Sequence, residues 1–102
     1  MASAGAAPAL AAVGTLIRSS HERWDGAGYP DRLGGDEIPL GARIVFACDS
    51  YDSMTTDRPY QSGITAAEAR DELLRHAGSQ FDPAVVDALL RVLDARAMAD
   101  AA

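Results

Sequence analysis

The strongest constraint on the fold of this chain is a long break in an otherwise helical sequence. Residues 24–37 include four glycines and one proline, and such a composition ends a helix and favours a loop. On both sides of this stretch, apolar residues recur every three or four positions, which is the spacing of one buried helical face. The chain is therefore expected to form helices on either side of one long loop.

Four helices are predicted, and they cover residues 8–23, 39–56, 65–78 and 83 onward. The third begins with a capping box, Thr65 followed by Glu68. The fourth begins with Asp82 as N-cap and Pro83 as first residue. Its buried face is expected to be Val86, Leu89, Leu90 and Leu93. Because no segment alternates as a strand does, the sequence predicts an all-α fold, with residues 1–7 as a flexible amino terminus.

Composition argues against several classes of function. The chain has 102 residues and a formal net charge of -6, which disfavours binding to a nucleic acid polymer or to an acidic membrane. No signal peptide is recognised at the amino terminus, and no apolar run approaches the ~20 residues that span a bilayer. A cytoplasmic location is therefore expected. The single cysteine, Cys48, excludes an internal disulfide and is expected to be a small core residue.

His21 and Asp49 are the first candidates for chemistry. His21 continues the apolar stripe of the first helix, which is formed by Leu10, Val13 and Ile17. By itself it is more readily interpreted as a core histidine. Asp49 lies in an apolar part of the second helix, where a carboxylate needs a hydrogen bond, a cation or a metal. Together the two side chains could be half of a metal site, and both interpretations stay open.

Arg58 follows the second helix in a rigid turn. Its guanidinium could reach a ligand phosphate near Asp49, because arginine is suited to bidentate contact with phosphate. Alternatively, Arg58 pairs with Asp57, with Asp52 or with the end of a helix. These alternatives also stay open, and Asp52 itself is expected to hold the loop or an arginine in place.

Two short patterns match known signatures but lack the surroundings that those signatures need. The run HERWD at residues 21–25 is similar to the zinc-binding helix HExxH, but Gly26 ends the helix at once. The run GGDE at residues 34–37 matches the signature of diguanylate cyclases, which belongs on a hairpin between apolar strands. Here a proline-started helix follows it, so we interpret the match as coincidence.

Four runs in a fixed order resemble the HD-GYP family. They are HERWDGAGYP at 21–30, GDEIPLGARI at 35–44, ACDSYDSMTTDRPY at 47–60 and GSQFDP at 78–83. The resemblance implies a helical bundle that corresponds to the carboxy-terminal part of an HD-type phosphohydrolase domain, here residues 8–102. Members of the family are metal-dependent bacterial phosphodiesterases that cleave cyclic di-GMP, and their sites hold two or three metal ions, often iron or manganese.

The same resemblance assigns roles to individual residues. It implies that His21 and Asp49 are metal ligands and that Arg58 lies near the substrate phosphates. The loop at residues 24–38 is called the GYP loop, and the resemblance implies that its segment Asp25–Pro30 shapes the pocket. The residues of this loop that are expected at the substrate are Asp25, Gly28, Tyr29 and Pro30. The loop is further expected to contact partners such as diguanylate-cyclase domains.

Two positions depart from the family pattern. Ser20 stands where the family has a histidine ligand, and a hydroxyl is a poor replacement for imidazole at a transition metal. Gln61 stands where the family usually has arginine or lysine, so one positive charge near the ligand is lost. The amino-terminal helices of the family, with the histidine-aspartate pair that names it, are not matched by this sequence.

We therefore expect a partial domain that is incomplete or inactive alone. A divalent transition metal is expected only if other residues complete the site, because two ligands do not hold a catalytic centre. Apolar surface on the first two helices predicts a homodimer, a domain swap or a partner that supplies the missing half. The alternatives are a non-catalytic signalling module that docks through the GYP loop and a purely structural helical module.

Overall fold

The central element of the fold is a long helix against which the other three helices pack. The computed structural model describes residues 6–101, and all of its regular structure in this range is helical. The elements are α1 (Ala6–Ser19), the short 3-10 helix η1 (Gly35–Glu37), α2 (Leu40–Thr55), α3 (Ala66–Arg75) and α4 (Pro83–Ala101). Helix α2 packs against α1, α3 and α4, and α3 also packs against α4. The all-α prediction is confirmed.

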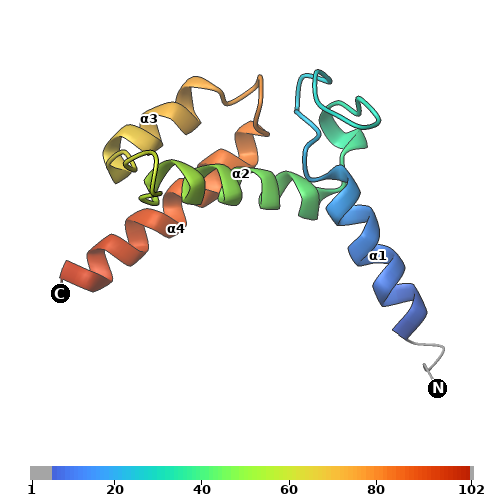
Figure 1. Ribbon diagram of the computed structural model, residues 1–102, viewed down its shortest axis with the longest axis horizontal. Coiled ribbons are helices and arrows are strands. Elements are labelled where there is room, and N and C mark those ends of the chain that lie inside the picture. Colours follow the sequence, from blue (N-terminus) through green and yellow to red (C-terminus); the bar gives the residue numbers. More distant parts are fainter. Residues whose placement is uncertain (1–5, 102) are drawn as a thin grey trace.

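The helices form an open arrangement around α2. Figure 1 shows α3 beside the carboxy-terminal part of α2 and α4 passing behind α2 and extending beyond it, while α1 leaves from the amino-terminal end of α2 and points away. The GYP loop folds back above the junction of α1 and α2 (Figure 1). Within residues 6–101, no helix is long and apolar enough to cross a membrane.

The helix starts that have strong capping signals are confirmed. The Thr65 hydroxyl accepts a hydrogen bond from the Glu68 N–H at 3.1 Å, and the Glu68 carboxylate accepts one from the Thr65 N–H at 3.2 Å. Helix α4 begins at Pro83, and the Asp82 carboxylate accepts a hydrogen bond from the Ala84 N–H at 2.9 Å. Both contacts satisfy N–H groups that a helix start leaves without an internal partner.

The predicted end of the first helix is wrong. Helix α1 ends at Ser19 rather than near Arg23, because the chain turns there and the Glu22 N–H bonds to the Ser19 carbonyl at 3.1 Å. His21 therefore lies beyond the helix and is not part of its apolar stripe. The predicted loose amino terminus falls outside the described residues at positions 1–5, whereas α1 already begins at Ala6.

The core lies between α2, α3 and α4. Its buried members are Ala47, Leu73, Phe81, Val85, Val86 and Leu90. The predicted face of α4 is confirmed, because Val86 and Leu90 are buried and Leu89 and Leu93 pack partly buried against the cluster. The rings of Phe46 and Phe81 lie 5.2 Å apart and connect α2 to the α3–α4 connection.

The prediction that Cys48 is a core residue is wrong. Ala47 faces the core, and the next residue of a helix is rotated about 100° around the axis, so Cys48 is exposed. Partial burial and the neighbouring Asp49 charge both raise the pKa of the Cys48 thiol, which disfavours a thiolate nucleophile.

Apolar side chains also lie exposed along one end of the molecule. They are Leu10, Val13 and Ile17 on α1 and Leu40, Ile44 and Val45 on α2. The expected apolar surface on the first two helices is therefore present. That a second copy of the chain or another protein covers this apolar surface stays a prediction.

A buried ion pair connects the loop, α2 and α4. The Arg43 guanidinium donates to the Asp82 carboxylate at 2.6 Å and to the Ile38 carbonyl at 2.9 Å. It also lies 5.9 Å from the centre of the Trp24 ring. Asp82 is only 6% exposed, so its charge depends on this partner for compensation.

Asp82→Asn is expected to lower the free energy of unfolding by about 3 kcal/mol, because it removes the close buried partner of the Arg43 charge and leaves only the exposed Asp36 carboxylate, 3.9 Å away. Asparagine also caps helices well, so the variant removes the charge and keeps the cap. Urea unfolding followed by circular dichroism measures the change. The control is Asp94→Asn, which breaks the exposed Arg70–Asp94 pair of the same 2.6 Å length and is expected to cost less than about 1 kcal/mol. Equal losses in the two variants would contradict the role given to Asp82.

Candidate functional site

An open pocket of about 400 Å³ lies where the end of α1, α2, α3 and the α3–α4 connection meet. Ser20 and His21 line it from the end of α1, and Asp49 and Ser53 line it from α2. His21 and Asp49 are thus brought to one pocket, although they are separated by the whole GYP loop and half of α2. Arg58, the other candidate, does not line this pocket.

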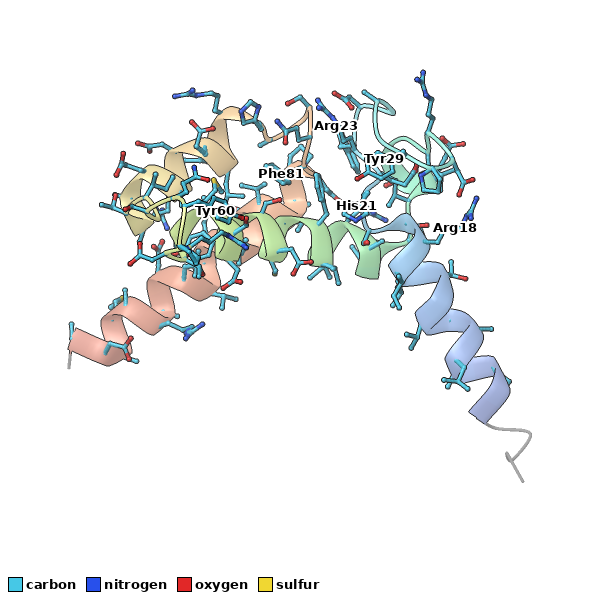
Figure 2. All side chains as sticks on the ribbon, in the orientation of Figure 1. Arg18, His21, Arg23, Tyr29, Tyr60 and Phe81 are labelled. Atoms are coloured by element: carbon cyan, nitrogen blue, oxygen red, sulfur yellow. The ribbon has the colours of Figure 1, made fainter. Side chains whose placement is uncertain are left out.

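His21 is an exposed residue of the turn that follows α1. Its ring stacks on the Tyr29 ring, with centroids 5.1 Å apart and planes 12° apart. Figure 2 shows the two rings together where α1 meets the GYP loop. The interpretation of His21 as a buried core histidine is therefore wrong. Asp49 is also exposed, so the expected desolvation of its carboxylate does not occur.

The turn that positions His21 is held by Glu22, a residue that sequence reasoning did not single out. Its side chain is buried, and its Oε1 accepts hydrogen bonds from the N–H groups of Asp31 at 3.0 Å and Leu33 at 3.2 Å. A buried carboxylate is stable only with such donors. The only hint in the sequence is an acidic residue between a helix and a glycine-rich loop.

Gly28 allows the loop to approach this turn closely. A Cβ atom at this position would lie 2.5 Å from both the Arg23 nitrogen and the His21 carbonyl oxygen, which is closer than real side chains come. The next N–H, that of Tyr29, donates to the same His21 carbonyl at 3.3 Å. Gly28 is buried and serves the packing of the loop against the backbone beside His21.

The loop is also tied to the rest of the bundle. The N–H groups of Trp24 and Asp25 donate to the carbonyls of Gln80 at 3.0 Å and Ser79 at 2.8 Å in the α3–α4 connection. Arg18 on α1 pairs with Asp31 of the loop at 2.8 Å. These contacts hold one edge of the pocket in place from both sides.

The four loop residues expected at the substrate lie around the pocket rather than in its wall. Asp25, Gly28, Tyr29 and Pro30 are not among its lining residues. The hydrogen bond from Arg23, followed by that from the Ala27 N–H, holds the pKa of the Asp25 carboxyl below its usual value. Of these four residues, Tyr29 stacks its ring on the lining residue His21.

Arg58 and Gln61 line a neighbouring hollow of about 280 Å³. This hollow and the pocket share Ser53 and Met54 as walls, so the two spaces adjoin along α2. The Arg58 guanidinium donates to the Ser53 hydroxyl at 3.3 Å. The alternative in which Arg58 pairs with Asp57 is not observed, and the Asp57 carboxylate accepts the Gly63 N–H at 2.8 Å.

One wall of the pocket was missed entirely by sequence reasoning. It comes from α3 and the residues that follow, and it includes Glu72, His76 and Gln80. Glu72 and His76 are four positions apart, and their Oε2 and Nε2 atoms lie 3.4 Å apart. Such spacing places two side chains on one helical face, but it does not show which face meets a pocket.

The described residues do not make up a metal centre by themselves. Within residues 6–101, no group of three or more histidine, cysteine, aspartate or glutamate side chains is arranged to hold a metal ion. His21 and Asp49 provide one imidazole and one carboxylate, a donor pair that suits transition metals. A catalytic metal usually has about three protein ligands.

The two signature matches that were set aside stay excluded by the geometry. The HERWD run lies in a turn and loop rather than on a helix, so it cannot present ligands on one helical face. The GGDE run continues into η1 at Gly35–Glu37 and does not lie on a hairpin.

The chain is similar to several known proteins. It matches the HD domain family over residues 3–85. It is 45% identical over 87 residues to a probable cyclic di-GMP phosphodiesterase of Vibrio cholerae, and the aligned region covers 84% of this chain and 20% of that protein. It is 50% identical over 80 residues to a cyclic di-GMP phosphodiesterase response regulator of Xanthomonas campestris, and here the aligned region covers 78% of this chain and 21% of that protein.

A solved structure supports the same relationship. The crystal structure of a cyclic GMP-AMP specific phosphodiesterase of V. cholerae superposes with a TM-score of 0.71 at 29% identity, over 81% of this chain and 19% of that one. The chain therefore spans about a fifth of the length of the proteins that it resembles.

Glu22→Ala is expected to speed hydrogen exchange at the N–H groups of Asp31 and Leu33 by about tenfold or more, because it leaves both without their acceptor. Exchange at single residues by nuclear magnetic resonance measures the effect. The control is Glu37→Ala, since the exposed Glu37 carboxylate also accepts a loop N–H, that of Gly34 at 3.1 Å. If each variant changes exchange only at the N–H groups whose acceptor it has lost, and by equal small factors, Glu22 does not organise the loop.

Proposed function

This chain belongs to the HD domain family, and from this membership we propose that its pocket binds a cyclic dinucleotide as part of a metal-dependent phosphodiesterase site. The observation that carries the proposal is the meeting of His21 and Asp49 in one open pocket. The names of the similar proteins, all cyclic dinucleotide phosphodiesterases, indicate the class of substrate.

In this proposal, His21 and Asp49 are two ligands of a divalent transition metal, iron or manganese. When bound, such a metal supplies an activated water and a counter-charge for phosphate. Because no three such side chains within residues 6–101 are arranged to hold a metal ion, further ligands must come from residues outside the described range or from another chain. We therefore assign no catalytic step to this chain alone.

The chain's own residues have positioning roles. Glu22 and Gly28 hold the backbone turn that presents His21, and Tyr29 fixes its ring by stacking. Arg58 is proposed to contact a phosphate from the neighbouring hollow, because that hollow adjoins the pocket through Ser53. Gln61 lines the same hollow and contributes no charge there.

A second function is favoured by the exposed rim of the GYP loop. The Tyr29 side chain is 63% exposed, and Pro30 beside it is also exposed. These residues could dock another protein, for example a diguanylate-cyclase domain, without any catalysis. The two functions differ in whether the pocket binds a metal and a cyclic dinucleotide.

Ser20→His is expected to raise the affinity of the chain for Mn²⁺ by about tenfold, because it adds an imidazole beside His21 in the pocket wall. Calorimetric titration with MnCl₂ measures the change. Ser62→His is the control, since it places the same side chain in the neighbouring hollow. An unchanged affinity in Ser20→His, or an equal gain in Ser62→His, would mean that the pocket is not assembled for a metal.

Arg58→Gln is expected to weaken binding of cyclic di-GMP by about tenfold, because hydrogen bonds to charged groups contribute about 1.5–3 kcal/mol. Gln61→Lys is expected to strengthen binding, since it adds a cation to the same hollow. Calorimetry measures both affinities, and Arg96→Gln on the exposed surface of α4 is the control for charge. Absence of binding by the unaltered chain would contradict the proposed function.

A further inference from the structure

The α3 wall of the pocket carries a second carboxylate and a second imidazole, separate from those of Asp49 and His21. Its ionisable members are Glu72 and His76, and Phe46 of α2 lines the same space. None of these three residues belongs to the runs that carry the family resemblance.

The Glu72 carboxylate is held in a defined orientation by two neighbours on its own helix. Its Oε1 lies 3.1 Å from the Arg75 guanidinium, and its Oε2 lies 3.4 Å from the His76 imidazole. A carboxylate has about four acceptor positions on its two oxygens, so each oxygen keeps capacity for a ligand. The side chain is 34% exposed, which leaves it accessible from the pocket.

The charge of Glu72 selects the type of ligand group. A carboxylate repels a phosphate and attracts N–H donors, because like charges disfavour contact and ionised acceptors make strong hydrogen bonds. Two parallel N–H donors on one planar edge match its two oxygens best. Among the parts of a cyclic dinucleotide, the guanine edge presents such a pair, at N1 and at the exocyclic N2. Adenine has an acceptor at N1 and no N2 group.

The size of the pocket suits one nucleotide unit. A volume of about 400 Å³ lies within the range of small-molecule sites, which is roughly 300–1,000 Å³. With the phosphate toward His21 and Asp49, the base of the same nucleotide would reach the α3 wall. The half-buried Phe46 then provides an apolar surface beside the base.

We propose that Glu72 is a specificity-determining residue that recognises the N1–H and N2–H groups of guanine, with His76 and Arg75 holding its carboxylate in place. The proposal rests on the proposed binding of a cyclic dinucleotide and adds which base the pocket accepts. A site that pairs its polar groups with a base edge rejects the analogue that lacks those donors, because the polar groups are then left unpaired.

The test compares three probes on the full chain: cyclic di-GMP, 3′3′-cGAMP and cyclic di-AMP. The unaltered chain is expected to bind the two guanine-containing probes at least about tenfold more tightly than cyclic di-AMP. Glu72→Gln is expected to weaken the binding of both guanine-containing probes by about tenfold, since an amide offers only one acceptor oxygen. Binding of cyclic di-AMP is expected to stay unchanged. His76→Gln is expected to produce a smaller loss with the same selectivity.

Asp71→Asn is the matched control, because Asp71 precedes Glu72 on α3, is exposed and does not line the pocket. It removes the same charge and is expected to leave all three affinities unchanged, and circular dichroism checks that each variant keeps its helices. If Glu72→Gln weakened the binding of all three probes equally, Glu72 would not recognise guanine, and the proposed function would still stand. Equal affinity of the unaltered chain for the three probes would also overturn the assignment to guanine. Failure of the unaltered chain to bind any probe would overturn the proposed function itself.

Discussion

The buried pair of Arg43 and Asp82 is the interaction on which the arrangement of this chain depends. A charge at this depth is unfavourable without a partner, so the start of α4 must stay beside α2. The same guanidinium binds the Ile38 carbonyl at the end of the GYP loop and lies over the Trp24 ring at its beginning. One side chain therefore connects both ends of the loop to the helical core.

The buried carboxylate of Glu22 extends this constraint to the candidate site. By accepting the N–H groups of Asp31 and Leu33, it draws the middle of the loop onto the turn that ends α1. Gly28 permits the contact, since a larger residue would collide with the backbone of that turn. The position of His21 thus follows from interactions of its neighbours, and its stacking on Tyr29 follows from the same geometry.

Local signals predicted the helices well wherever the stabilising contact is itself local. The capping box at Thr65 and the N-cap at Asp82 lie within three residues of the N–H groups that they bind, so the sequence suffices to find them. The end of α1 was predicted wrongly because the contacts of Glu22 reach residues 31 and 33, beyond any helical period. Cys48 was misplaced because an apolar run shows which helix is amphipathic but not which of two adjacent residues faces the core.

The sequence by itself determined the helical class, three of the four helix starts and the family, and it identified His21 and Asp49 as the residues to examine. These features depend on spacing and on motif order, which are properties of the chain alone. Only the tertiary structure decided that the two residues share one open pocket, that both are exposed, and that Glu72 and His76 form another of its walls. The physical reason is that a pocket is made by the packing of α2 and α3 with the end of α1, and the pattern within any one helix does not specify which of its faces will meet the others.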